Sequence, residues 1–318
     1  MLSDLCVQSK ALVYAGLRDS THTAYNSAQK AYIDFCALYS LQPVPVDHNV
    51  ILLYITHMFN KGLAFSTIQV YISAIRSLQV MAGYEEPNLR SPQVRLALKA
   101  VQMNTLPPKQ KCPIDYLLLC KMLQLVELGV DNKVWSALLS LAFFAGLRGC
   151  EYTNQLINGK CVYVTLNQLK FGNQNSEIIM YYQVIRTKTT MHGFTIPIGC
   201  TKVPVCPVCY MMRYLMRFSG QCAVSGNSPL FTTSDGTPIS KSMVNVKLKQ
   251  LAAALKLDPS SFSTHSIRAG AASTAARLGF RDWEIKRLGG WSSAAYRRYI
   301  RNLDSHVAGF AARLTSQP

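Results

Sequence analysis

The chain has 318 residues, 49% of them hydrophobic and only 15% charged, so it is long enough for two ordinary domains and too apolar for a disordered chain. Lysine and arginine outnumber aspartate and glutamate by 33 to 16, and the formal net charge of +17 favours a polyanionic partner, with nucleic acid first. The charge is uneven, because residues 1–110 carry nine basic and six acidic groups and the rest carries 24 and ten. From charge alone, a protein that is simply basic stays an open alternative.

Four helical segments are expected in the first third of the chain. A helical period begins after a capping Thr21, and Asp47 is expected to cap the next segment. A third helical segment, with apolar residues along one face, ends at Gly83, and Pro92 begins a fourth, shorter helix. These segments predict a compact all-helical domain over residues 1–106.

A segment with three prolines follows and is predicted to be an interdomain linker, placed at residues 107–113. Residues 114–318 then form the second domain. Two helical patterns come first, and the apolar run at 134–147 is too short for a bilayer and indicates a buried core helix. Three strand-like runs lie between residues 161 and 199, and helices resume from residue 208. The predicted fold class is therefore mainly α with a small antiparallel β-sheet.

Ten cysteines are scattered through apolar helical patterns, which favours a reducing compartment over a disulfide framework. The one cluster is "CTKVPVCPVC", with Cys200, Cys206 and Cys209. A zinc site would need a fourth ligand, for which His192 is the nearest candidate, and small buried cysteines are the favoured interpretation. The N-terminus shows no signal-peptide pattern, and we expect no membrane partner.

Four segments of the second domain carry polar or charged residues that a purely structural core would not need. In "FFAGLRGCE", Arg148 follows an apolar helix and needs an anionic partner, which Glu151 can supply at a helix end. Lys188 lies near the tip of a predicted hairpin, where a lysine is usually just solvated. In "FSTHSIRAG", a cap at Ser263 or Thr264 places His265 and Arg268 together in the first turn of a helix, whose amides attract anions.

The fourth segment is "GGWSSAAYRRYIR", which holds Trp291, Tyr296 and Tyr299 on a predicted helix. Taken together, two arginines, a histidine and an indole can bind the oxygens of a phosphodiester in a pentacoordinate transition state. A tyrosine can supply the nucleophile and a lysine can protonate the leaving oxygen. These segments contain no acidic cluster for two metal ions and no glycine-rich phosphate loop.

The chain resembles the tyrosine recombinase and phage-integrase family over essentially its whole length. "GLRGCE", "RTKTTMHGFTIPIG", "HSIRAG", "LGGWSS" and "YRRYIR" resemble the successive catalytic boxes of that family, and the wording of the last is most like recombinases of eukaryotic Crypton or DIRS-type mobile elements. The resemblance implies a helical core-binding (SAM-like) domain, a linker and a catalytic domain. Tyr299 stands closer than Tyr296 to the usual spacing after Trp291.

For the site, the resemblance implies that the catalytic residues are Arg148, Lys188, His265, Arg268, Trp291 and the nucleophile Tyr299, with Glu151 in support and Tyr296 packing. It also implies DNA cleavage and rejoining through a 3′-phosphotyrosine link without a metal, ATP or another cofactor. The partners would be double-stranded DNA and further copies of the chain, in a dimeric or tetrameric synaptic complex. In a eukaryotic source the protein would act in the nucleus.

Two other functions stay open: a catalytically silent host-adopted DNA-binding protein of the same fold, and relaxation of DNA in the manner of a type IB topoisomerase. DNA affinity is expected to come mostly from phosphate contacts and to fall steeply with salt. The candidate DNA contacts are Thr67, Gln69, Arg76, Arg186, Lys241, Arg281, Arg297 and Arg298.

Overall fold

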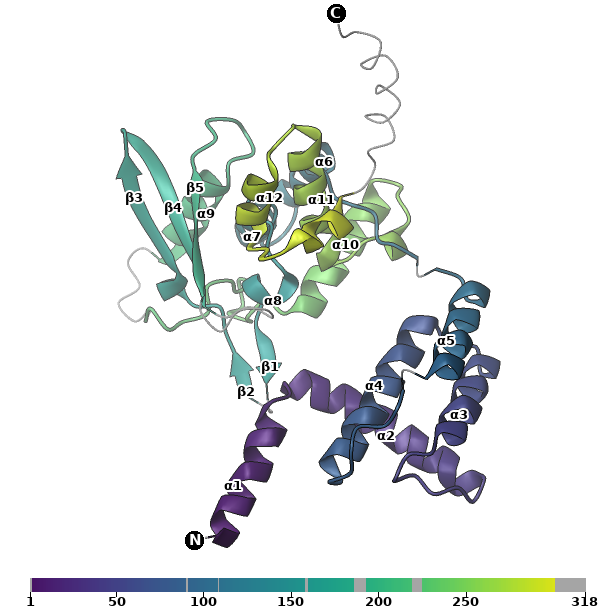
Figure 1. Cartoon of the computed structure of the whole chain (residues 1–318). Coiled ribbons are helices and arrows are strands. Elements are labelled where there is room, and N and C mark those ends of the chain that lie inside the picture. Colours follow the sequence, from purple (N-terminus) through teal and green to yellow (C-terminus); the bar gives the residue numbers. More distant parts are fainter. Residues whose placement is uncertain are drawn as a thin grey trace, which may run out of the picture. The chain divides into compact units, whose positions relative to one another are not determined.

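A computed structural model describes residues 2–89, 91–107, 109–157, 160–185, 193–218 and 225–300. The chain divides into two compact units, Met1–Lys109 and Gln110–Pro318. Both units are mainly helical, and the second also holds a three-stranded antiparallel sheet, which confirms the predicted fold class (Figure 1). No helix among the described residues is both long and apolar enough to span a membrane.

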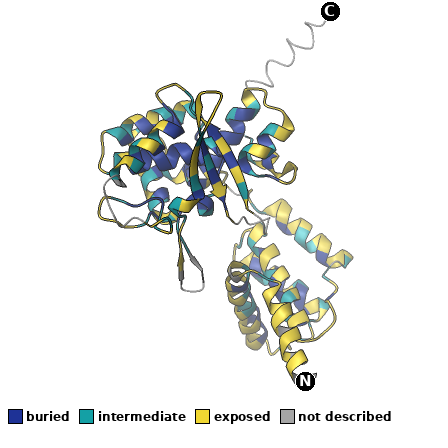
Figure 2. Ribbon diagram, turned by 90° about the vertical axis from the view of Figure 1, so that its left-hand side faces the viewer, coloured by how far each residue is buried: buried dark blue, intermediate teal, exposed yellow. Residues whose placement is uncertain are grey.

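The first unit is a helical bundle with its own apolar core. Its helices are α1 (Leu2–Ala15), α2 (Asp19–Leu38), α3 (His48–Asn60), α4 (Phe65–Met81) and α5 (Pro92–Asn104). Buried aromatic and aliphatic side chains of α2, α3, α4 and α5 form the core, among them Tyr32, Tyr54, Ile68 and Val94. The outer faces of the same helices are exposed (Figure 2).

The caps of these helices test the sequence reading directly. Asp47 caps α3 as predicted, since its carboxylate accepts hydrogen bonds from the amides of Asn49, at 2.7 Å, and Val50, at 3.3 Å. Pro92 opens α5 as predicted. The predicted cap at Thr21 is wrong, because α2 already begins at Asp19. The sequence analysis also missed α1, whose described side chains take no part in the apolar core of the unit.

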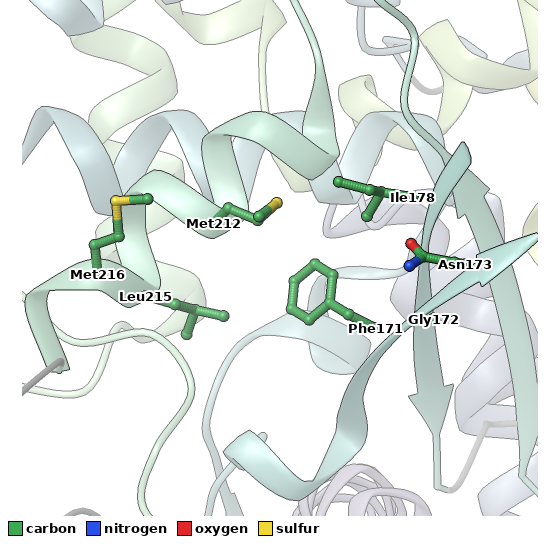
Figure 3. A pocket seen from close by; sticks show the side chains of 7 residues that line it. All are labelled: Phe171, Gly172, Asn173, Ile178, Met212, Leu215 and Met216. Carbon is green, nitrogen blue, oxygen red and sulfur yellow. The ribbon is translucent and has the colours of Figure 1, made fainter. Parts of the chain in front are cut away.

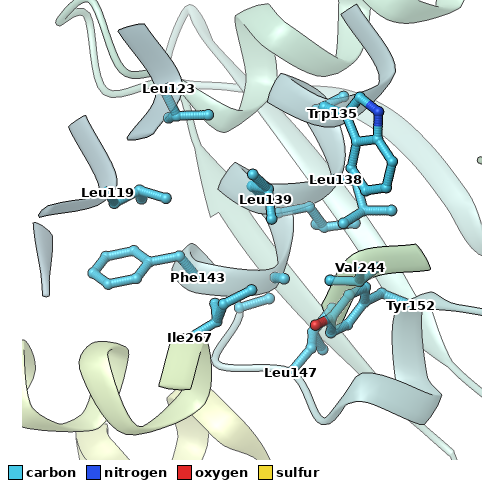
Figure 4. Packing of buried hydrophobic residues seen from close by; sticks show 14 of the residues in the cluster. Leu119, Leu123, Trp135, Leu138, Leu139, Phe143, Leu147, Tyr152, Val244 and Ile267 are labelled. Carbon is cyan, nitrogen blue, oxygen red and sulfur yellow. The ribbon is translucent and has the colours of Figure 1, made fainter. Parts of the chain in front are cut away.

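The second unit is built around a largely buried helix, α7 (Asn132–Phe144). Its helices are α6 (Tyr116–Glu127), α7 (Asn132–Phe144), α8 (Gly149–Tyr152), α9 (Pro207–Leu215), α10 (Lys241–Ala254), α11 (Thr264–Arg277) and α12 (Asp282–Gly289), with short 3₁₀ turns η1 (Leu166–Gln168), η2 (Met216–Phe218), η3 (Pro259–Ser261) and η4 (Ala294–Tyr299). Every residue of α7 from Val134 to Phe143 is buried, as expected for the longest apolar run. Side chains of α6, α10 and α11 pack around it (Figure 4).

The sheet covers another side of this core. It consists of β3 (Leu169–Gln174), β4 (Glu177–Val184) and β5 (Phe194–Gly199), in that order and antiparallel throughout. Met180, Tyr182 and Val184 alternate with more exposed neighbours, so one face of β4 packs inward against α9. The first predicted strand run is divided, because residues 161–162 belong to a separate hairpin of β1 (Gln155–Ile157) and β2 (Lys160–Val162).

The predicted linker is shared between the units. The contact boundary falls between Lys109 and Gln110, and the residues after it hydrogen-bond to the second unit. The amide of Cys112 donates to the Ser261 carbonyl at 2.8 Å, and that of Ile114 to the Ser266 carbonyl at 2.9 Å. A Cβ on Gly270 would lie 1.6 Å from the Ile114 carbonyl oxygen, so α11 packs directly on the backbone of Ile114 at this glycine.

Candidate active site

Two helix ends meet around the buried side chain of Arg268. Gly146 lies two residues beyond the end of α7 and Gly290 caps α12, each in the left-handed conformation, with φ of 54° and 61°. The two turns touch, since a Cβ on Gly146 would lie 3.3 Å from the Cα of Gly289. Arg268 donates one hydrogen bond to the Gly146 carbonyl and another to the Gly289 carbonyl, the latter at 2.9 Å. Carbonyls at helix C-termini carry partial negative charge, so they offset the burial of this cation.

Aromatic rings cover the Arg268 guanidinium. Its Cζ lies 3.8 Å from the centroid of the Trp291 ring and 5.4 Å from that of Tyr299, and the two rings are 5.7 Å apart. The side chain is 0% exposed. Burial, and then the nearby charge of Arg148, lower the pKa of Arg268 to about 10, while Glu151 and Tyr299 act in the opposite direction. The group therefore stays cationic at neutral pH.

Arg148 presents the second guanidinium of the site. It precedes α8, and Glu151 in that helix accepts from its backbone amide at 2.8 Å and from its Nη1 at 2.7 Å. The Glu151 side chain is fully buried and that of Arg148 is 16% exposed, so the carboxylate holds the arginine from the protein side. The pairing predicted for a helix end is therefore present, and it orients Arg148 with part of its surface accessible.

The two tyrosines of η4 have different surroundings. The predicted helix is a 3₁₀ turn, in which side chains three apart lie over one another, and both rings contact Trp291. Tyr296 is 2% exposed and its hydroxyl donates to the carboxylate of Asp282. Tyr299 is half-buried beside Arg268, and its carbonyl accepts from the Ser273 hydroxyl at 3.1 Å. Only Tyr299 thus combines partial exposure with an adjacent buried cation.

The first turn of α11 lies against α8. A Cβ on Gly149 would be 3.0 Å from Thr264 Oγ1 and 3.3 Å from Lys241 Cε, so α8, α10 and α11 begin at one place. Ser263 is the N-cap, one of the two candidates from the sequence. His265 is exposed while Arg268 is fully buried, so the two do not share one accessible face as expected. Lys241, predicted only as a DNA contact, lies beside Gly149, the residue that follows Arg148.

Some predicted site residues fall elsewhere or outside the description. Lys188, Arg186 and His192 lie outside the described residues. Thr67, Gln69 and Arg76 belong to α4 of the first unit, where Gln69 is exposed and Arg76 pairs with Glu86 at 2.6 Å. Arg281, Arg297 and Arg298 are exposed around α12 and η4, and Arg297 lies 3.3 Å from Asp282.

Sequence reasoning missed the groups that hold the site together. The Gly146 and Gly289 carbonyls, Asp282 and Ser273 all hydrogen-bond to predicted site residues or their neighbours. The glycines were visible as helix ends, but a backbone acceptor leaves no side-chain signal. Asp282 stands 14 residues before Tyr296, beyond any helical spacing.

A separate pocket of about 490 Å³ lies between β3, β4 and α9 (Figure 3). Its lining is mostly apolar and consists of Phe171, Gly172, Asn173, Ile178, Met212, Leu215 and Met216. None of these residues titrates, and none belongs to the cluster around Arg268. The pocket therefore offers no acid, base or nucleophile, in contrast to the cluster around Arg268.

Arg148, Arg268, Trp291, Tyr299 and Glu151 thus come together from segments up to about 150 residues apart. The arrangement holds two guanidinium groups near a phenol, with one carboxylate that pairs with Arg148. Such a site suits a ligand with several anionic oxygens and a nucleophilic attack by the phenol on it.

Solved structures of recombinases and integrases resemble this chain. The Tn1549 transposon integrase in complex with circular intermediate DNA aligns with a TM-score of 0.60 and 15% identity, over 95% of this chain and 98% of that one. A lambda integrase dimer bound to a COC′ core site gives 0.59 and 15%, over 95% and 77%. The XerH site-specific recombinase bound to its difH substrate gives 0.52 and 12%, over 88% and 75%.

No family model matches the sequence, and no curated protein matches it. The structural likeness nevertheless extends over both units, because each alignment covers most of the chain. At such low identity the shared property is the fold, and the chain has the fold of the tyrosine recombinases and integrases.

Proposed function

We propose that the chain is a site-specific DNA recombinase or transposon integrase that cleaves and rejoins DNA through a covalent 3′-phosphotyrosine link to Tyr299. The observation that carries the proposal is the convergence of Arg148, Arg268, Trp291 and Tyr299 in one cluster. The basic second unit and the fold shared with DNA-bound recombinases and integrases support a DNA substrate.

In the proposed reaction the Tyr299 hydroxyl oxygen attacks a backbone phosphorus. The bond from phosphorus to the tyrosine oxygen forms, the bond from phosphorus to the 5′ oxygen breaks, and Lys188 donates a proton to that leaving oxygen. Arg148 and His265 bind the non-bridging oxygens, and Arg268, which is fully buried against Trp291, acts on the phosphate through its positive charge. The positive charge of Arg268 also stabilises the negative charge that develops on the attacking oxygen as its proton leaves for solvent.

The second step reverses the first with a new partner. A 5′ hydroxyl of another strand attacks the phosphotyrosine, the tyrosine oxygen departs and takes up a proton, and a recombinant strand results. The free energy of the phosphodiester is kept in the protein link, so neither ATP nor a metal ion enters this scheme. Exchange between two sites calls for self-association into a dimer or tetramer on DNA.

The proposal extends to the type of mobile element, the cellular compartment and the DNA contacts. The resemblance of the last boxes to Crypton and DIRS-type elements favours a mobile-element recombinase that acts in the nucleus of a eukaryotic host. The exposed Lys241, Arg281, Arg297 and Arg298 are proposed to contact DNA phosphates, with Thr67, Gln69 and Arg76 of α4 as contacts from the first unit.

The test uses suicide DNA substrates that carry the end sequence of the mobile element and a nick next to the cleavage site. We expect a covalent protein–DNA adduct on a denaturing gel, stable to heat and detergent and removed by protease. Tyr299→Phe should abolish the adduct and keep DNA binding. Tyr296→Phe, the matched control three residues away, should still form it.

Other outcomes would change the nucleophile or the function. An adduct that persists in Tyr299→Phe and disappears in Tyr296→Phe would overturn the assignment of the nucleophile. DNA binding without any adduct on several cognate-like substrates would favour the silent DNA-binding protein. Relaxation of supercoils without recombinant product would favour topoisomerase activity.

A further inference from the structure

Three cysteine side chains converge where the sheet meets α9, away from the Arg268 cluster. Cys200 directly follows β5, Cys206 is the N-cap of α9, and Cys209 lies in its first turn. Their sulfur atoms all lie within 4.8 Å of one another. Within the described part of the chain, this is the group of cysteine, histidine and acidic side chains arranged closely enough to hold a metal ion.

The sulfur–sulfur distances distinguish a metal site from a disulfide. Cys200 Sγ lies 3.5 Å from Cys206 Sγ and 3.8 Å from Cys209 Sγ. A disulfide bond would need about 2.05 Å. Thiolates bound tetrahedrally to zinc at about 2.3 Å are separated by about 3.8 Å, the edge of that tetrahedron. These two separations are therefore close to the edge of a zinc tetrahedron, and the third pair of sulfur atoms lies within 4.8 Å.

Backbone amides support a charged sulfur at the centre of the cluster. The buried Cys206 Sγ accepts hydrogen bonds from the amide of Thr201 at 3.4 Å and from that of Cys209 at 3.5 Å. A buried thiolate without donors would be costly, and such amide donors orient and stabilise metal-bound sulfur. The exposure of the three cysteines also differs: Cys206 is buried, Cys200 is half-buried and Cys209 is exposed, so the predicted role as small buried groups does not fit all of them.

The turn between the ligands adds positive charge. Lys202 takes the left-handed conformation, with φ of 57°, in the loop that returns the chain from Cys200 to Cys206. Its ammonium pairs with Glu177 of β4 at 2.7 Å and lies near enough to Cys200 to interact with its charge. Three thiolates on a divalent ion leave one net negative charge, which this lysine partly balances.

We propose that Cys200, Cys206 and Cys209 bind one zinc ion as three thiolates and thereby fasten the end of β5 to the start of α9. A fourth ligand, water or a further side chain, completes the coordination. The site is structural, since α9 packs on both β4 and α7, and α7 leads to Gly146 and Arg148. It is independent of strand transfer, so a negative adduct assay leaves it unaffected.

Metal analysis of the full chain tests the proposal. The protein is purified with a thiol-compatible reductant and zinc, and zinc per chain is measured by inductively coupled plasma mass spectrometry. We expect one zinc per chain, lost in Cys206→Ser and in Cys209→Ser. Cys112→Ser and Cys161→Ser change exposed cysteines outside the cluster and should retain the metal.

Cobalt substitution gives a second test, by absorption spectroscopy, that needs no variant. After chelation and addition of Co²⁺, the wild-type chain should show thiolate-to-cobalt charge-transfer absorption and the strong visible bands of tetrahedral Co²⁺, both removed by excess Zn²⁺. Absence of these bands in a folded chain overturns the proposal even where a serine variant fails to fold. Zinc retained in Cys206→Ser, or a Cys200–Cys206 disulfide in protein alkylated without reduction, also overturns it.

Discussion

Arg268→Lys should destabilise the second unit while it preserves the positive charge. The guanidinium reaches two backbone carbonyls with two different nitrogens and stacks on Trp291, whereas lysine has a single nitrogen, which cannot occupy both positions, and it has no plane to stack. Loss of one hydrogen bond to a charged group costs about 1.5–3 kcal/mol. Loss of a desolvated cation–π contact costs up to about 2 kcal/mol. We therefore expect a decrease of about 3 kcal/mol in the free energy of unfolding, a large part of typical domain stability.

Tryptophan fluorescence during urea unfolding measures this change in the second unit alone. All three tryptophans of the chain, Trp135, Trp283 and Trp291, lie in that unit. The matched control is Arg297→Lys, because Arg297 is largely exposed and its solvated pair with Asp282 contributes little to stability. If Arg268→Lys unfolded at the same urea concentration as wild type, the buried contacts of this guanidinium would not hold the two helix ends together.

Three further changes follow from the same contacts. Glu151→Gln should lower the unfolding free energy by about 1–3 kcal/mol and reduce adduct formation, because Arg148 loses its buried carboxylate; Glu284→Gln, which alters a similar but more exposed cap of the Arg281 amide, should cost less in urea titrations. Gly270→Ala should cost about 3 kcal/mol or more, since its Cβ would overlap the Ile114 carbonyl, whereas Gly199→Ala, with nothing within 4 Å, should be near neutral by thermal melting. Tyr296→Phe should destabilise the unit only above acid pH: the Tyr296 hydroxyl, and also Arg297, lower the pKa of Asp282, so their contribution is complete above the ordinary aspartate pKa and lost as pH falls through the lowered value. An equal effect of Tyr296→Phe at all pH values would contradict that last expectation.

Helices were predicted well from the sequence where a single local feature determines the helix. Asp47, Pro92 and the apolar run of α7 each carry a local cause, either a cap or burial on all sides, and the structure confirms them. The start of α2 was predicted less well. Its N-cap is Arg18, an unusual residue at this position, and no side-chain cap hydrogen bond forms there. α1 was missed because that helix lies outside the apolar core and so lacks a strong stripe.

Four of the predicted site residues lie together in the structure, but the sequence did not show how they are held. Arg148, Arg268, Trp291 and Tyr299 were named from motifs, and the structure brings these four together. The fully buried position of Arg268 could not be foreseen, because the acceptors that allow it are main-chain carbonyls of α7 and α12. The 3₁₀ form of η4 was also hidden, since arginine and tyrosine suit an α-helix equally well.

Variants of buried site residues should behave differently from variants of exposed ones. Arg268 and Glu151 are buried and hold helix ends in place, so the protein orients them during folding, before any ligand arrives. Because the same contacts stabilise the fold, loss of either side chain should lower stability and strand transfer together. His265 and Lys241 are exposed, so their loss should reduce strand transfer or DNA binding with little change in unfolding. A measured pair of values, unfolding free energy and adduct yield, therefore assigns each residue to the scaffold or to the reaction more reliably than activity alone.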